Sequence, residues 1–111
     1  MLIDESKLRL MWMMVMFDLP VVEENDRKQA TKFRSHLMDL GFEMAQFSVY
    51  FRFCGTREGT EKFVRAIRAS LPTEGNVSIL FFTDRQFSEI INIQNKKTMK
   101  NPEKADQYML F

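Results

Sequence analysis

The chain has 111 residues, 45% hydrophobic and 28% charged, which is typical of one soluble globular domain rather than a disordered or two-domain chain. Its 16 basic and 15 acidic residues give a net charge of +1, so any nucleic-acid-binding surface has to be a local patch. The single cysteine and single histidine exclude an intrachain disulfide and argue against a histidine–cysteine zinc site.

The N-terminal segment predicts a strand rather than a targeting sequence. Asp4 and Glu5 stand where a signal peptide carries positive charge, and the apolar run Leu10 to Phe17 is far shorter than the roughly 20 residues that span a bilayer. We therefore expect a cytoplasmic protein without a membrane partner. Residues 8–18 are apolar on both faces, as in a strand covered on both sides, and Pro20 ends the strand.

Residues 23–42 predict an amphipathic helix. Acidic residues lie at its start, Ala30, Phe33, Leu37 and Leu40 recur at helical spacing, and Gly41 suits the left-handed position that ends a helix. Residues 42–53 then alternate like one strand, or two with a kink. The odd-numbered residues from Ala45 to Phe53 form a core face, and the even-numbered residues form a mixed face.

The second half of the chain also alternates predicted helices and strands. Residues 55–72 predict a helix that Pro72 ends, and 77–82 predict a strand. Thr83 and Gln86 have the spacing of a capping box, which predicts a single helical turn, and 90–95 predict one more short strand. The order predicts an α+β, ferredoxin-like β-α-β-β-α-β domain over residues 1–95, with an extra C-terminal strand and a polar tail over 96–111.

In this fold two helices cover one face of the sheet, and the other face is open to a dimer partner, a nucleic acid or a ligand. Ser48 and Tyr50 on the mixed face are either solvated or hydrogen-bonded across a dimer interface, and Tyr50 could instead stack on a base. The tail ends in an apolar tetrad that we expect to dock on a partner: Tyr108, Met109, Leu110 and Phe111.

Asp18 is the main chemical candidate, because it places a carboxylate at the end of an apolar strand. It could simply start a turn. In a two-fold dimer, however, two copies of Asp18 would approach each other, and a divalent cation between them would relieve their repulsion and activate a water against a phosphodiester. The basic residues of the two helices are either a solvated face or a phosphate-binding surface; those assigned to nucleic acid are Arg27, Lys28, Arg34, Arg65 and Arg68.

Four segments together resemble the CRISPR-associated protein 2 family: "MFDLP" (16–20), "LMDLGF" (37–42), "AQFSVYFRF" (45–53) and "VSILFFTDRQF" (77–87). The resemblance covers roughly residues 8 to 93. Its most specific parts are Asp18 at the strand end and the segment from Gln46 to Phe51. The connector "VVEEND" and the tail after Asn95 resemble members from type II systems, which use a single large effector nuclease.

The resemblance implies a homodimer in the CRISPR spacer-acquisition complex, which bridges dimers of the CRISPR-associated protein 1 integrase and binds the duplex DNA to be integrated. It also implies a magnesium-dependent endonuclease acting on RNA or DNA, with Asp18 as the catalytic, metal-binding residue. The leading interpretation is an architectural, DNA-binding subunit, and the metal-dependent nuclease is the second. The alternatives are a free-standing, toxin-like magnesium-dependent ribonuclease of the same fold and a ligand-sensing domain, although glycine-rich effector turns are missing.

Overall fold

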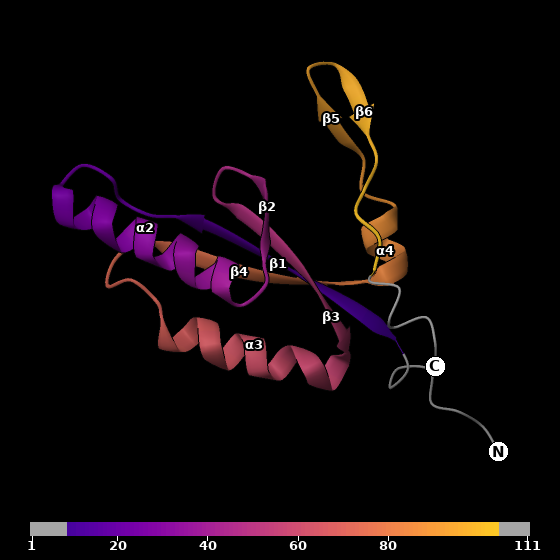
Figure 1. Ribbon diagram of the computed structural model, residues 1–111, viewed down its shortest axis with the longest axis horizontal. Coiled ribbons are helices and arrows are strands. Elements are labelled where there is room, and N and C mark those ends of the chain that lie inside the picture. The colour runs from indigo at the N-terminus through magenta and orange to yellow at the C-terminus, as the bar shows by residue number, and fades with distance from the viewer. Residues whose placement is uncertain (1–8, 105–111) are drawn as a thin grey trace.

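The computed structural model describes residues 9–104, and within them the predicted ferredoxin-like order is confirmed (Figure 1). The elements in chain order are β1 (Leu10–Asp18), α2 (Glu24–Asp39), β2 (Glu43–Gln46), β3 (Val49–Thr56), α3 (Arg57–Ala69), β4 (Asn76–Thr83), α4 (Asp84–Ser88), β5 (Asn92–Gln94) and β6 (Lys97–Met99). The first four strands form one antiparallel sheet in the order β2-β3-β1-β4. No helix within residues 9–104 is long and apolar enough to cross a membrane.

Helices α2 and α3 lie on the same face of the sheet and bury the larger core beneath them (Figure 1). Phe33 and Leu37 from α2 and Ile67 from α3 are almost fully buried, as the helical spacing predicts. They pack on the side chains of β1 that face the helices, among them Val15 and Phe17. The Phe17 and Phe33 rings meet edge to face, with their centroids 5.2 Å apart.

The opposite face of the sheet is covered at one end by α4. Thr83 caps this short helix through the predicted box, in which the Gln86 N–H donates to Thr83 Oγ1 at 3.1 Å and the Gln86 side chain accepts from the Thr83 N–H. The cap positions Phe87 flat against Trp12, with ring centroids 3.9 Å apart. Phe51 and Phe53 complete this second apolar cluster.

The C-terminal end of α2 is held by two devices. Gly41 adopts the predicted left-handed conformation, with φ +89°. Arg52 on β3 donates from Nε to the Leu40 carbonyl at 2.8 Å and lies over the Phe63 ring of α3, with Cζ 4.3 Å from the ring centroid. This arginine therefore joins both helices to the sheet.

The segment from 42 to 53 is two strands. Phe51 and Phe53 share a buried face as predicted, but the side predicted to be mixed faces the larger core, and Phe47 is not buried. A turn at Phe47 and Ser48 separates β2 from β3, and Ser48 has φ +68°. Tyr50 is 2% exposed and packs under the helices against Phe17, so its side chain is not on an open face. Phe51, predicted to face the same core as Phe47, lies on the α4 side, while Phe47 is 76% exposed.

The predicted extra strand does not join the main sheet. Instead β5 pairs with β6 in a separate hairpin that stands away from the sheet (Figure 1). Asn95 and Lys96 form its turn, and both have positive φ, as a two-residue hairpin loop of the favoured hand requires. The expected boundary between residues 95 and 96 therefore falls inside this turn, and Lys97–Met99 is a strand rather than tail.

Candidate metal and nucleic-acid site

Asp18 ends β1 on the face of the sheet that α2 and α3 leave uncovered. Successive side chains of a strand alternate between faces, so Asp18 shares a side with Trp12 and Met16, whereas Phe17 lies in the core beneath the helices. Asp18 is exposed to solvent. The opening strand therefore presents a carboxylate at the end of an apolar face, as the sequence predicts.

Asn76 lies directly opposite Asp18 in the antiparallel pairing of β1 with β4. Directly opposed residues share a face and have neighbouring Cβ atoms, so a carboxylate and an amide stand side by side. Gly75, with φ +103°, carries the chain into this pair, and a Cβ there would lie 2.8 Å from the Asp18 carbonyl oxygen. Sequence reasoning missed Asn76, because only the strand register brings it to Asp18.

The oxygen atoms of Asp18 and Asn76 are of the kind that Mg²⁺ prefers, since this ion is usually held by one or two carboxylates together with water and substrate phosphate. Residues 9–104 contain no group of three or more acidic, histidine or cysteine side chains that could hold a metal ion. One chain thus offers half of a plausible donor set, and a second copy related by a two-fold axis would double it.

The uncovered face next to Asp18 carries an apolar strip, beside which exposed Ser78 lies opposite Met16 and exposed Gln46 lies opposite Val49. Met16 is 42% exposed, and Met14, Val49 and Leu80, which pair across the same three strands, are only partly buried. The far end of the face is closed by Phe87 of α4. Phe87 also lines a cavity of about 550 Å³ between the sheet face and the β5–β6 hairpin, together with residues that include Met14, Phe51 and Ile93.

Ser48 lies close to Asp18 through its backbone. Its carbonyl accepts the N–H of Phe17 at 3.0 Å, which ties the β2–β3 turn to the end of β1. Ser48 is partly exposed, so a role at a dimer interface stays a prediction. Tyr50, the second residue predicted for that interface, is in the core instead.

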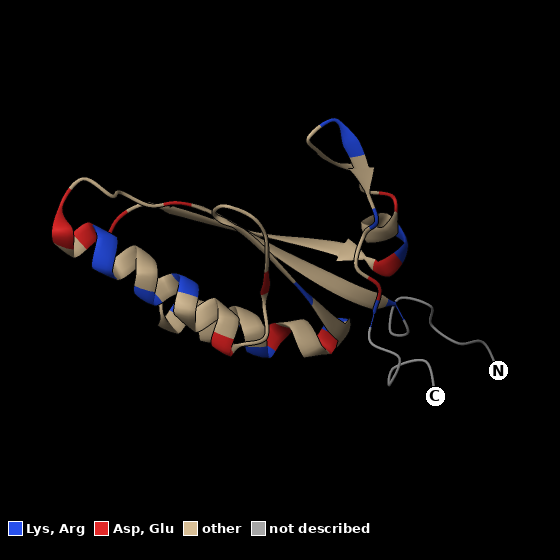
Figure 2. Cartoon of the chain, turned by 45° about the horizontal axis from the view of Figure 1, so that its top comes forward, with Lys and Arg blue, Asp and Glu red and all other residues tan. Residues whose placement is uncertain are grey.

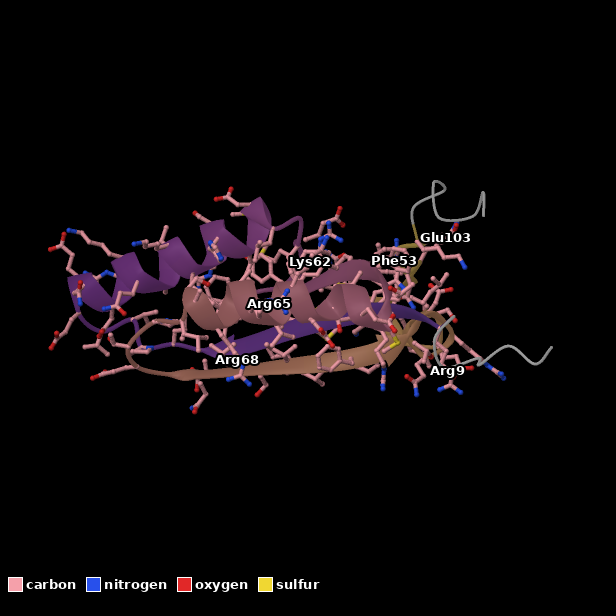
Figure 3. All side chains as sticks on the ribbon, turned by 90° about the horizontal axis from the view of Figure 1, so that it is seen from below. Arg9, Phe53, Lys62, Arg65, Arg68 and Glu103 are labelled. Atoms are coloured by element: carbon pink, nitrogen blue, oxygen red, sulfur yellow. The ribbon has the colours of Figure 1, made fainter. Side chains whose placement is uncertain are left out.

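Two of the predicted nucleic-acid-binding residues lie on the outer surface of α3. Arg65 and Arg68 are exposed one turn apart, and Figure 3 shows them in a row with Lys62 along the helix. None of the three forms an ion pair with any residue between 9 and 104. This unpaired cationic row is able to bind phosphates.

The three predicted residues on α2 differ from one another. Arg27 donates to the carbonyls of Val21 and Val22 at 3.1 and 2.9 Å, which fixes the connector before the helix. Lys28 pairs with Glu24 at 3.6 Å on the exposed surface. Arg34 is turned toward the rings of Phe17 and Phe47. Acidic residues lie at the two ends of this helix and basic residues lie between them (Figure 2), but the three predicted side chains are engaged in different contacts and do not form one free basic surface.

The thiol of Cys54 and the carboxylate of Asp84 have structural roles. Burial raises the pKa of the Cys54 thiol to about 11, so the thiol is protonated near neutral pH and is not a nucleophile there. Asp84 accepts a hydrogen bond from Trp12 Nε1 at 2.8 Å and pairs with Lys104 at 3.6 Å. The predicted docking tetrad of residues 108–111 lies outside the described range.

Comparison with known proteins identifies relatives over nearly the whole chain. The family model of CRISPR associated protein Cas2 matches residues 11–90. A CRISPR-associated endoribonuclease Cas2 of Paracidovorax avenae is 45% identical over 103 residues, which is 93% of this chain and 95% of that protein. One of the same name from Flavobacterium psychrophilum is 40% identical over 106 residues, 96% of this chain and 92% of that protein.

The matched region spans β1 through α4 and most of the connecting turns, and so includes Asp18, Asn76 and the α3 arginines. It confirms the family resemblance that the strand-ending aspartate and the Gln46–Phe51 segment indicate. The type II subtype stays a prediction. On the extent of these matches and the agreement of the fold, the chain belongs to the CRISPR-associated protein Cas2 family.

Proposed function

We propose that the chain works as a homodimer in CRISPR spacer acquisition, where it binds duplex DNA and bridges dimers of the CRISPR-associated protein 1 integrase. The observation that carries this proposal is the uncovered apolar sheet face that ends in Asp18. An antiparallel sheet can leave one face in water, but such a face is ordinarily polar. Met16 is instead 42% exposed there, beside half-buried Met14 and Leu80.

A second copy is the occupant that fits this face. Its own apolar patch would match the first, as an isologous two-fold interface requires. Because the far end of the face is closed by α4, the copies would meet at the end that carries Asp18. The two Asp18–Asn76 pairs would then approach each other and supply two carboxylates and two amide oxygens.

These four side chains offer the oxygen ligands that Mg²⁺ prefers. A bound Mg²⁺ would polarise a phosphate oxygen and activate a coordinated water. Asp18 would hold the ion as an ionised carboxylate, and Asn76 would orient it through an uncharged oxygen. The unpaired cations Arg65 and Arg68 on α3 are suited to phosphates of either strand, which gives affinity without sequence preference.

Cleavage of RNA or DNA is the second candidate function. It is favoured by the exposed Asp18 carboxylate and by the name endoribonuclease that the relatives carry. A free-standing ribonuclease would use the same metal-holding residues without the integrase. The substitution Asp18→Asn therefore distinguishes the two functions. It would abolish metal-dependent cleavage, because the metal ligand is lost, but it would leave the apolar dimer interface and hence the assembly intact.

The test is gel filtration with light scattering of the chain, alone and mixed with the integrase and a short duplex. Wild type should be dimeric and co-elute with both. Met16→Glu should dissociate the dimer, whereas the matched control Met38→Glu should not, because Met38 is 53% exposed on α2, across the sheet from the proposed interface. A monomeric wild type, or a dimer unaffected by Met16→Glu, would reject the proposed interface. A dimer that binds neither integrase nor duplex would reject the bridging role.

A further inference from the structure

The turn between β2 and β3 exposes an aromatic ring that is stacked on a cation. Phe47 is 76% exposed. The Arg34 guanidinium of α2 lies over its ring, with Cζ 4.5 Å from the ring centroid, and is also 5.7 Å from the centroid of Phe17. One side of the Phe47 ring is thus covered by a cation, and most of the remaining ring surface faces solvent.

Arg34 has unused hydrogen-bonding capacity. Its Nε atom is buried without a hydrogen-bond partner, and within residues 9–104 the guanidinium forms neither an ion pair nor a hydrogen bond. Buried polar groups of proteins are nearly always paired, so an unpaired one needs an explanation. The buried Nε is out of reach of an external anion, but the terminal Nη groups of this guanidinium have no carboxylate partner and are able to bind one.

This pair lies at the same end of the sheet as Asp18. Phe17, which contacts Arg34, directly precedes Asp18 in β1. The Phe17 N–H donates to the carbonyl of Ser48 at 3.0 Å, so the turn that carries Phe47 is fastened to this strand end. Ser48 holds the turn in a left-handed conformation, with φ +68°.

An exposed ring beside an unpaired cation matches the chemistry of a nucleotide, which combines a flat base with an anionic phosphate. Bases inside a duplex are already stacked on both neighbours, whereas an unpaired base has a free face for the Phe47 ring. We propose that Phe47 and Arg34 form a subsite for an unpaired nucleotide at the Asp18 end of the sheet, with the base on Phe47 and the phosphate on Arg34. This inference rests on the nucleic-acid binding proposed above.

The test uses a single-stranded oligonucleotide that carries 2-aminopurine, and the same sequence as a duplex. Stacking on Phe47 should quench the fluorescence of the single strand with wild type. Phe47→Leu should weaken single-strand binding about 5- to 150-fold, the range found when one stacking aromatic is removed, and should abolish the quenching. Phe47→Trp should retain both, and the duplex should bind all three proteins alike.

Phe81→Leu is the matched control, because Phe81 is 45% exposed on β4, an edge strand of the sheet that does not touch β2. This variant should bind and quench as wild type does. Arg34→Gln should reduce single-strand affinity and its dependence on salt. Light scattering of every variant reports whether the dimer is intact, which distinguishes loss of a nucleotide site from loss of a protein interface.

Three results would overturn the inference. Unchanged single-strand affinity and quenching in Phe47→Leu, with duplex binding intact, would reject the subsite and leave the proposed function standing. Loss of the dimer in Phe47→Leu would show that the ring belongs to a protein interface. Absence of binding to either form of nucleic acid by the wild type would reject the subsite together with the proposed nucleic-acid binding.

Discussion

Asp84 allows a sharp test of how α4 and the C-terminal segment are held on the sheet. Its carboxylate accepts the indole N–H of Trp12 at 2.8 Å and pairs with Lys104 at 3.6 Å. Trp12 is 3% exposed, so in the folded chain its N–H depends on this acceptor rather than on water. Asp84→Ala removes both interactions, whereas Asp84→Asn keeps a neutral oxygen acceptor for Trp12 and removes the ion pair and the charge.

The two variants should lower the free energy of unfolding by different amounts. A hydrogen bond to a charged group contributes about 1.5–3 kcal/mol, and a partly exposed ion pair contributes about 0.2–1 kcal/mol. Asp84→Ala should therefore lower the free energy of unfolding by about 2–4 kcal/mol. Asp84→Asn should lower it by about 1–2 kcal/mol, because it removes the ion pair and replaces a charged acceptor by a neutral one that contributes about 1 kcal/mol less. Lys104→Ala should lower it by only about 0.2–1 kcal/mol, because it removes the ion pair and leaves the charged acceptor of Trp12 in place.

The assay is urea unfolding followed by Trp12 fluorescence, since this is the single tryptophan of the chain, with circular dichroism as a second probe. All proteins should be compared at one chain concentration, because the stability of a dimer depends on it. Equal free energies of unfolding for Asp84→Ala and Asp84→Asn would refute the reasoning. So would a cost of Asp84→Ala below about 0.5 kcal/mol, since it would mean that the buried N–H is satisfied in another way.

Three further predictions concern the site and the core. The double variant Arg65→Gln/Arg68→Gln should remain dimeric, and the slope of log affinity for duplex DNA against log salt should fall by about 0.9 for each phosphate that the variant no longer neutralises; an unchanged slope would place the DNA elsewhere. Gly75→Ala should lower the free energy of unfolding by about 1–3 kcal/mol and weaken Mg²⁺ binding, because the new Cβ would lie 2.8 Å from the Asp18 carbonyl oxygen at a φ of +103°. Urea unfolding measures the first effect and calorimetry the second, and wild-type values in both would contradict this geometry. Burial raises the pKa of Cys54 to about 11 in the folded chain, against an ordinary value of 9.0, so the folded state holds this proton more tightly than the unfolded state. The resulting stabilisation is complete below about pH 9 and is lost as the pH rises toward about 11. Wild type should therefore lose more stability over that interval than Cys54→Ala, and equal losses in the two proteins would contradict the assignment.

The helical parts of the fold could be predicted from sequence because they carry independent signals that agree. In α2 the apolar spacing of Phe33 and Leu37 and the stop at Gly41 indicate the same helix. In α4 the Thr83–Gln86 box is found in the structure as predicted. The strand-ending Asp18 was also recognisable, because a charge after eight apolar residues is conspicuous without any knowledge of pairing.

The faces of β3 could not be predicted in the same way. Both of its faces are aromatic, with Tyr50 under the helices and Phe51 and Phe53 under α4, so alternation does not distinguish them. The turn before β3 places Ser48, rather than glycine, at positive φ, which removes the usual hairpin signal. The same reason hides the β5–β6 hairpin, where Asn95 and Lys96 form the turn.

The remaining parts of the site depend on long-range register. Asn76 is separated from Asp18 by two helices in sequence and becomes its neighbour only through the pairing of β1 with β4. Arg34 belongs to a helix whose charges suggest solvent exposure, yet it is turned onto Phe17 and Phe47. Periodicity within one element contains no information about either juxtaposition.

The central claim is that two Asp18–Asn76 pairs meet across a dimer axis and share one cation. Isothermal titration of the dimer with Mg²⁺, with light scattering of the same samples, tests it most directly. The account predicts one ion for every two chains in wild type, no binding in Asp18→Asn, weaker binding in Asn76→Ala, and a dimer in all three. One ion for each chain, or a titration that Asp18→Asn leaves unchanged, would contradict it.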